Sequence, residues 1–240
     1  MNNNDYALIT GASRGIGASI AKQLAKDGYN ILLNYKSNDS KAKKVCEEIK
    51  NIGRKCELLK FDVSDSKSVK INLKSHVKNK KIKILVNNAS HTVMQSFLQT
   101  TEKDWDNIIS VVLGGFYNLT QSVLPNMISN NGGKIINITS IGAFSADVNV
   151  GYAAAKAGLV GATRALANEI KKTNVLVNAI APGPIYTDYF GSKTKEEASL
   201  SVGQKVGEPE DIANMVSFLC SEKANYINGQ VFHINGGMYI

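Results

Sequence analysis

The sequence predicts a single α/β domain built on a doubly wound, parallel, seven-stranded sheet. Short apolar runs rich in β-branched residues alternate with longer segments of helical periodicity, which is the pattern of successive βαβ units. These apolar runs are solid rather than alternating, as expected for strands that helices cover on both faces. A chain of 240 residues with 43% hydrophobic residues also fits one large domain.

The predicted elements follow one another along the chain. The expected strands are Ala7–Thr10, Ile31–Tyr35, Glu57–Phe61, Ile84–Asn87, Lys134–Thr139, Val175–Ile180 and Gln230–Ile234. The expected helices are 16–27, 40–51, 66–78, 101–127, 151–170 and 208–220. Right-handed crossovers place the carboxyl ends of all these strands at one edge of the sheet, where such folds bind ligands. Residues 187–207 break the alternation and are predicted to form a mobile flap over that edge.

Composition argues against several classes of protein. No apolar run reaches the roughly 18 residues needed to span a bilayer, and the first residues lack the pattern of a secretory signal. The three cysteines, Cys46, Cys56 and Cys220, are far apart in the sequence and form no CxxC pair. We therefore expect free thiols in a reducing cytoplasm and neither a disulfide nor a bound metal.

The net charge of +8 is concentrated in one fifth of the chain. Residues 36–83 hold 15 Lys and Arg against 6 Asp and Glu, and the rest of the chain is nearly neutral. These cations are mostly lysines without interleaved aromatic residues, so nucleic acid is not the expected partner. A solvated helical face is the preferred interpretation, and electrostatic steering of a phosphate-bearing cofactor or an acidic partner is the alternative.

A glycine-rich loop directly follows the first strand and opens the first helix. Its sequence from Thr10 to Gly17 is TGASRGIG, and its glycines permit a tight turn, close backbone approach to a pyrophosphate and close packing of helix on strand. The free amides and the positive dipole end of the helix add anion binding. This loop predicts a Rossmann-type dinucleotide site. The expected contacts are Gly11, Ser13, Arg14, Gly15, Ile16 and Gly17.

The end of the second strand predicts which dinucleotide binds. Enzymes that prefer NAD usually place an acidic side chain there, to accept a hydrogen bond from the ribose 2′-hydroxyl. This strand ends with Asn34, Tyr35, Lys36 and Ser37, which include no acid. Arg14 and Lys36 can instead pair with a 2′-phosphate, so we expect NADP(H), with the alternative that both are ordinary surface cations.

Tyr152 and Lys156 are four residues apart and so share one face of a helix. Such a pair also arises by chance, and Tyr189 with Lys193 is a second example. Context separates the two pairs, because Ser140 ends the fifth strand twelve residues before Tyr152 and lies at the same sheet edge as the glycine loop. We predict that Ser140, Tyr152 and Lys156 are catalytic and that the other pair is coincidental.

The three predicted catalytic groups suit hydride chemistry at a carbonyl. A phenol with a pKa near 10 is a poor acid at neutral pH, and a neighbouring ammonium stabilises its phenolate. Tyr152 is expected to protonate the alkoxide, Ser140 to hold the carbonyl oxygen, and Lys156 to tune Tyr152 and bind the ribose hydroxyls. A buried tyrosine, a strand serine and an exposed lysine without catalytic function remain the alternative.

The GxxxGxG loop and the Ser/Tyr/Lys set together resemble the short-chain dehydrogenase/reductase family over residues 6–240. Within that family the chain is most similar to β-ketoacyl-[acyl-carrier-protein] reductases, notably at Thr10–Gly17, Asn34–Ser37, Tyr152–Gly158, Glu208–Asn214 and Asn235–Ile240. The resemblance implies that Asp62 and Val63 contact the adenine, although Asp62 could instead cap a turn with Ser64. It also implies cofactor contacts at the ends of two later strands. The first group is Asn88, Ala89 and Ser90, and the second is Pro182, Gly183, Ile185 and Thr187. A simple turn is the alternative for the second group.

Two positions depart from the family pattern. Val112 stands where many members carry an asparagine that completes a water relay, and Ser90 replaces a glycine. Valine still provides the backbone carbonyl that holds the relay's water, so we expect a slower or differently relayed enzyme rather than an inactive one.

The family resemblance implies reduction of a 3-oxoacyl thioester, in fatty-acid or polyketide-type synthesis, by a homotetramer. The thioester is carried by CoA or by acyl carrier protein. Family members that bind the acidic carrier protein usually offer arginines near two helix ends, where this chain has Ser129–Gly132 and Lys171–Thr173. Another ketone or sugar reductase of the family is the second interpretation, and a dinucleotide-binding protein without turnover is the third.

Overall fold

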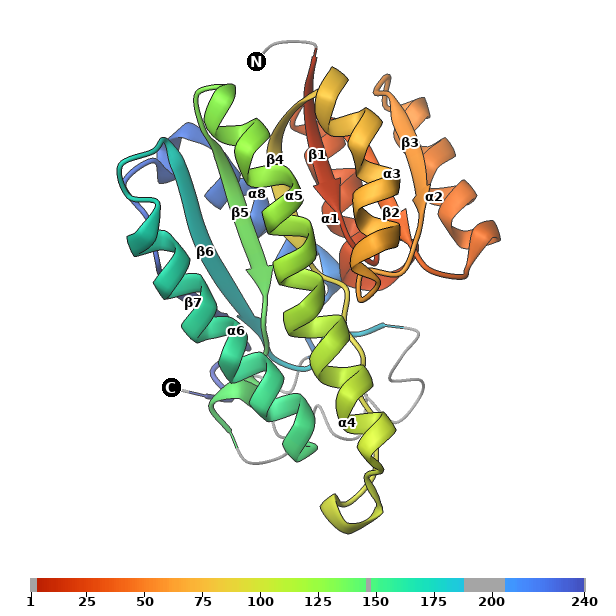
Figure 1. The fold of residues 1–240 in the computed structure, drawn as a ribbon, viewed down its shortest axis with the longest axis vertical. Helices are drawn as coiled ribbons and strands as arrows, with labels where there is room; N and C mark the ends of the chain where they lie inside the picture. The colour runs from red at the N-terminus through yellow and green to blue at the C-terminus, as the bar shows by residue number, and fades with distance from the viewer. Residues whose placement is uncertain (1–3, 146–147, 188–205, 240) are drawn as a thin grey trace.

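The computed structural model describes residues 4–145, 148–187 and 206–239, and it confirms the predicted fold class (Figure 1). Seven parallel strands form one sheet in the order β3-β2-β1-β4-β5-β6-β7. They are β1 Asp5–Ile9, β2 Asn30–Tyr35, β3 Cys56–Lys60, β4 Lys81–Asn87, β5 Gly133–Ile138, β6 Val175–Pro182 and β7 Val231–Ile234. The order reverses between β1 and β4, so the crevice expected for a ligand lies at the carboxyl ends of these two strands.

Helices cover both faces of the sheet, with α3, α5 and α6 on the near face in Figure 1 and α1, α2 and α8 behind it. Their bounds are α1 Gly15–Lys26, α2 Asp39–Asn51, α3 Ser66–Asn79, α4 Glu102–Ile109, α5 Gly115–Ser129, α6 Val150–Glu169 and α8 Pro209–Cys220. Each face has its own apolar core, so the strands are buried on both sides as their solid apolar sequences predict.

The predicted helix 101–127 is one continuous helical run that is interrupted by a wider turn. A π-turn from Ser110 to Gly114 separates α4 from α5, and Val112 lies inside it. Apolar periodicity does not reveal one extra residue in a helical turn, so the sequence predicted an unbroken helix. Turns of this kind are frequent at functional sites.

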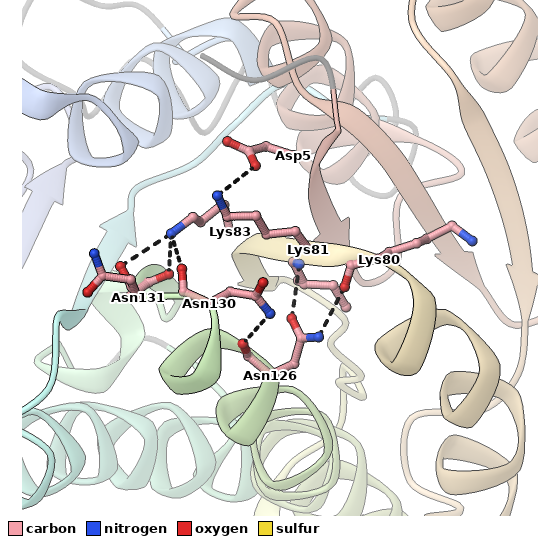
Figure 2. A network of polar contacts seen from close by, with 9 residues as sticks. Asp5, Lys80, Lys81, Lys83, Asn126, Asn130 and Asn131 are labelled. Atoms are coloured by element: carbon pink, nitrogen blue, oxygen red, sulfur yellow. Dashed lines mark hydrogen bonds and ion pairs between the residues drawn. The ribbon is translucent and has the colours of Figure 1, made fainter.

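Strand β4 begins three residues earlier than predicted, because two lysines made its start look polar. Lys81 forms an ion pair with Asp5 on the neighbouring strand, with an N–O distance of 3.5 Å. Lys83 donates from Nζ to the carbonyl oxygens of Asn130 at 2.9 Å, Asn131 at 3.3 Å and Gly132 at 2.9 Å (Figure 2). These carbonyl oxygens follow the carboxyl end of α5. Carbonyl groups there have no amide donors within the helix, and the helix dipole gives this end a partial negative charge.

Replacing Lys83 with methionine should lower the free energy of unfolding by about 1–3 kcal/mol, because partly buried carbonyls lose a charged donor. Urea denaturation measures this change, and the exposed Lys70→Met on α3 is the matched control. Turnover should remain unchanged, because Lys83 lies near the amino end of its strand, away from the ligand edge. Equal stability of the two variants would contradict this role for Lys83.

Candidate active site

The glycine loop has the backbone shape of an anion cradle. Gly11 and Gly15 have φ angles of 63° and 55°, in the left-handed region that favours glycine. A Cβ on Gly17 would lie 2.5 Å from the carbonyl oxygen of Gly11, so only glycine allows the helix to pack this closely. The side chain of Arg14, which precedes α1, does not cap the helix. The first amides of α1 can therefore face an anionic ligand.

Two predicted cofactor contacts at the end of β2 have side chains that are engaged within the protein. Asn34 is buried, accepts from the Gly11 amide at 3.4 Å, and donates to the carbonyl oxygens of Leu59 and Phe61 at 3.1 Å each. Asn34 thus fastens the glycine loop to β3. The Tyr35 hydroxyl donates to Asp39 at 2.8 Å, and burial together with this acid raises the pKa of Tyr35.

Lys36 and Asp62 form an ion pair whose N–O distance is 2.6 Å. The other carboxylate oxygen of Asp62 accepts from the Ser64 amide at 2.9 Å and the Ser64 hydroxyl at 2.7 Å. Partial burial alone would raise the pKa of Asp62, but Lys36 and Ser64 outweigh it and hold that pKa below its ordinary value. The structure therefore shows that Asp62 caps a turn with Ser64, and the contact of Asp62 and Val63 with the adenine stays a prediction. Because the Lys36 side chain is 70% exposed, this pair contributes little stability and can yield to another anion.

The end of β4 is fastened to the glycine loop. Asn88 donates from its carboxamide to the carbonyl oxygens of Thr10 at 2.8 Å and Gly11 at 3.3 Å. The Thr10 hydroxyl accepts in turn from the amides of Asn88 and Ala89, both at 2.9 Å. Ser90 follows in an exposed position. The strand ends on either side of the topological switch are thus held together.

The structure places Ser140 and Tyr152 where the sequence predicted them. Ser140 follows β5, and its Oγ accepts from the Gly142 amide at 3.0 Å, which starts a 3-10 turn over Ile141–Ala143. Tyr152 lies in the first turn of α6, where Asn149 caps the helix by accepting from the amides of Gly151 at 2.9 Å and Tyr152 at 3.3 Å.

Lys156 is a buried lysine that lies against the ring of Tyr152. Its Nζ is 5.5 Å from the ring centroid and donates to the carbonyl oxygen of Ile138 at 2.8 Å, at the end of β5. Only 2% of Lys156 is exposed, and this burial lowers the pKa of its ammonium to about 7. A buried amine with such a pKa is typical of a functional site rather than of a surface residue.

The segment after β6 approaches the glycine loop from the other side. Ile185 is buried and pairs with Gly207, while Thr187 lies beside Gly15, 3.2 Å from where a Cβ would stand. The structure thus brings Ile185, just before the predicted flap, against Gly207, its last residue. Most of that flap, with Tyr189 and Lys193, lies outside the described residues.

Sequence reasoning missed a buried polar chain beneath the site. Asn87 donates to Asn137 at 2.9 Å, and Asn137 donates to Thr163 on α6 at 2.8 Å. In the described part of the chain the Oδ1 atom of Asn87 is buried without a partner, and Asn87 lines a small cavity together with Val112. The sequence signal for this chain was the presence of asparagines at the ends of otherwise apolar strands. Val112 packs with Ile108, Ala155 and Leu159, so an apolar contact joins the π-turn to α6.

Comparison with known proteins agrees with this geometry. A family model described as enoyl-(acyl carrier protein) reductase matches residues 11–239. The chain is 42% identical to a 3-oxoacyl-[acyl-carrier-protein] reductase of Staphylococcus epidermidis, covering 99% of this chain and 100% of the relative. It belongs to the short-chain dehydrogenase/reductase family. A reductase of the same description from Aquifex aeolicus is 41% identical, over 97% of this chain and 96% of the relative.

Solved structures of short-chain dehydrogenases share the whole fold. The chain superposes with a TM-score of 0.92 on a short-chain dehydrogenase from Burkholderia cenocepacia in complex with NADP, at 31% identity and 98% coverage of both chains. An acetoin dehydrogenase from Enterobacter cloacae gives a TM-score of 0.90 at 31% identity, covering 98% of this chain and 95% of that one. Members of this family with the same fold therefore include enzymes named for quite different carbonyl substrates.

Proposed function

We propose that this single-domain protein is an NADPH-dependent ketoreductase that reduces a 3-oxoacyl thioester to the 3-hydroxyacyl thioester, in fatty-acid or polyketide-type synthesis. The observation that carries the proposal is the buried Lys156 against the Tyr152 ring, at the sheet edge that also holds Ser140 and the glycine loop. Relatives named as 3-oxoacyl-[acyl-carrier-protein] reductases match over nearly the full chain at 41–42% identity and indicate the substrate class.

The residues at the sheet edge fit a dinucleotide. The left-handed glycines and the open amides of α1 suit a pyrophosphate, and Asn34 and Asn88 brace that loop from either side. Arg14 and Lys36 offer cations to a 2′-phosphate, for which Lys36 leaves its exposed pair with Asp62. When bound, NADPH supplies the hydride that reduces the carbonyl carbon.

The side chains of this site handle the proton and the oxygen. Ser140 donates a hydrogen bond to the carbonyl oxygen, which holds the ketone and stabilises the negative charge that develops there. Tyr152 gives its proton to that same oxygen. Lys156 binds the ribose hydroxyls, and its positive charge lowers the cost of the phenolate that remains on Tyr152.

Replacing both Arg14 and Lys36 with alanine should lower the preference for NADPH over NADH by about 10–100-fold, because each cation contributes a charge-assisted hydrogen bond. Steady-state KM values for the two cofactors measure the change, and the exposed Lys44→Ala on α2 is the control. An unchanged cofactor ratio would show that other residues recognise the 2′-phosphate, or that the protein does not distinguish the cofactors.

A steady-state assay of NADPH oxidation with acetoacetyl-CoA and a carrier-bound analogue tests the proposed reaction. We expect turnover with both thioesters. Turnover with simple ketones or sugars alone would favour a different reductase of the family, such as the acetoin dehydrogenase that shares this fold. Tight NADPH binding without oxidation across a broad carbonyl panel would favour a non-catalytic protein.

We also propose that the protein is a cytoplasmic homotetramer, joined through α4, α5, α6 and the carboxyl-terminal segment. The helical run Glu102–Ser129 is long and apolar enough to cross a membrane, yet only a third of its most apolar stretch is buried within the chain. Tyr117 and Ile128 are exposed on it. A second copy packed on this face accounts for these apolar side chains without a membrane, and light scattering tests the mass.

Acyl carrier protein is the proposed partner for one form of the substrate. The end of α6 is followed by Lys171 and Lys172, whereas the end of α5 is followed by Asn130 and Asn131. We expect the lysine-rich segment 36–83 to be a solvated face and not a nucleic-acid surface. Comparing kcat/KM for carrier-bound and CoA-bound acetoacetyl groups shows whether the carrier contributes to binding.

A further inference from the structure

Three aromatic rings from separate parts of the chain meet beside the turn that carries Ser140. The centroid of the Phe144 ring is 4.7 Å from that of His233 and 5.6 Å from that of Tyr239. The rings of His233 and Tyr239 are stacked, with centroids 5.4 Å apart and planes at 26°. All three separations lie in the range of interacting aromatic pairs.

Phe144 is tightly connected to Ser140. The Gly142 amide donates to Ser140 Oγ at 3.0 Å, and the Ala143 amide donates to the Ser140 carbonyl oxygen at 3.1 Å. The amides of Phe144 and Ser145 both donate to Ile141, at 2.8 and 2.9 Å. Because these bonds close a continuous turn, a displacement of the Phe144 ring also moves the Ser140 hydroxyl.

His233 and Tyr239 belong to β7 and to the carboxyl-terminal turn, which lie beside the end of β6. His233 lies on β7, in register with Ala181 of β6, one residue before the end of that strand. Tyr239 lies in the carboxyl-terminal turn, where its carbonyl oxygen accepts from the Asn235 carboxamide at 2.9 Å.

The carboxyl-terminal turn packs closely against Gly183, in the segment after β6 that is predicted to contact the cofactor. The Gly183 amide donates to the Ile234 carbonyl oxygen at 2.9 Å. A Cβ on Gly183 would lie 2.8 Å from the Cα of Asn235, so the two backbones are in close contact. The aromatic cluster therefore links the turn that carries Ser140, proposed to hold the ketone oxygen, to the segment predicted to contact the cofactor.

We propose that Tyr239 and His233 are positioning residues, which act through Phe144 to hold the Ser140 turn at a constant distance from the Gly183 segment. The kinetic consequence rests on the proposed ketoreductase function, whereas the structural consequence does not. Misplacement of a catalytic group by about 1 Å can cost up to a hundredfold in rate, so a loosened turn lowers turnover without preventing cofactor binding. Neither residue needs to touch the substrate.

The test compares Tyr239→Ala and His233→Ala with Tyr239→Phe and with Tyr226→Ala, a fully exposed tyrosine after α8. For the two cluster variants we expect kcat to fall about tenfold, with the dissociation constant for NADPH within about twofold of wild type. Tyr239→Phe keeps the ring and should retain activity, as should Tyr226→Ala. Hydrogen exchange of the amides in residues 139–145 should be faster in the cluster variants alone, at unchanged oligomeric mass.

Unchanged exchange in residues 139–145 in both cluster variants would overturn the proposal, whatever the kinetics. Faster exchange spread over the whole sheet with a lowered Tm would also overturn it, because the cluster would then serve only general stability. His233→Ala carries the test if Tyr239→Ala fails to fold. A wild-type protein without turnover on any thioester would contradict the proposed function, yet the exchange experiment would still decide the role of the cluster.

Discussion

Replacing Tyr152 with phenylalanine should reduce kcat by about a thousandfold, because a positioned proton donor typically contributes 10²–10⁴-fold. The variant loses one hydroxyl and keeps the ring that packs against the Lys156 ammonium. The glycine loop and its hydrogen bonds with Asn34 and Asn88 do not involve Tyr152. The affinity for NADPH should therefore stay within about twofold of wild type. Steady-state kinetics and fluorescence titration with NADPH measure the two quantities.

The control for this experiment is Tyr226→Phe, which removes a fully exposed hydroxyl after α8. It should leave kcat unchanged. Full activity of Tyr152→Phe would refute the role of Tyr152 as proton donor. Loss of NADPH affinity together with activity would instead indicate that the hydroxyl supports the cofactor site.

Replacing Lys156 with methionine should abolish turnover and alter how stability depends on pH. The pKa of Lys156 is about 7 in the folded chain, whereas a lysine in an unfolded chain has a pKa near 10.4. Between these values the unfolded chain binds more protons, so the wild-type protein gains stability as pH rises from 7 to about 10. At 1.36 kcal/mol per pH unit the gain is roughly 3–5 kcal/mol, and it is absent from the variant.

The free energy of unfolding of wild type relative to Lys156→Met should therefore increase between pH 7 and pH 10, as measured by urea denaturation without cofactor. The lost hydrogen bond to the Ile138 carbonyl oxygen shifts the two curves by a constant amount and does not change this slope. Lys70→Met, at an exposed position, should follow the wild-type curve. Parallel curves for Lys156→Met and wild type would mean that Lys156 is charged and solvated in the folded chain.

The fold and the outline of the site were predictable because they depend on local patterns. The backbone periodicity of strands and helices explains the solid apolar strands and the four-residue spacing of Tyr152 and Lys156. The glycine loop is a short contiguous motif that is visible in the sequence itself. Parallel topology then places the strand ends at one edge, so Ser140 lies at the same sheet edge as the glycine loop. No side-chain detail is needed for these steps.

Other features depend on contacts between residues that are distant in the sequence. The sequence did not predict that Asn34 braces the glycine loop, that Lys36 pairs with Asp62, or that Phe144 meets Tyr239. Each of these side chains has several possible partners in the sequence, and only the packed structure shows which partner it contacts. The π-turn was missed for a related reason, because one extra residue in a turn leaves the apolar pattern nearly intact.

A crystal structure with NADP⁺ and a bound 3-oxoacyl analogue would show directly whether Tyr152 can protonate the ketone oxygen. We expect the Tyr152 hydroxyl to lie about 2.6–3.2 Å from the ketone oxygen, with the Lys156 ammonium at the nicotinamide ribose. A bound ketone held beyond hydrogen-bond reach of Tyr152, with that hydroxyl directed away from the nicotinamide, would contradict this role of Tyr152.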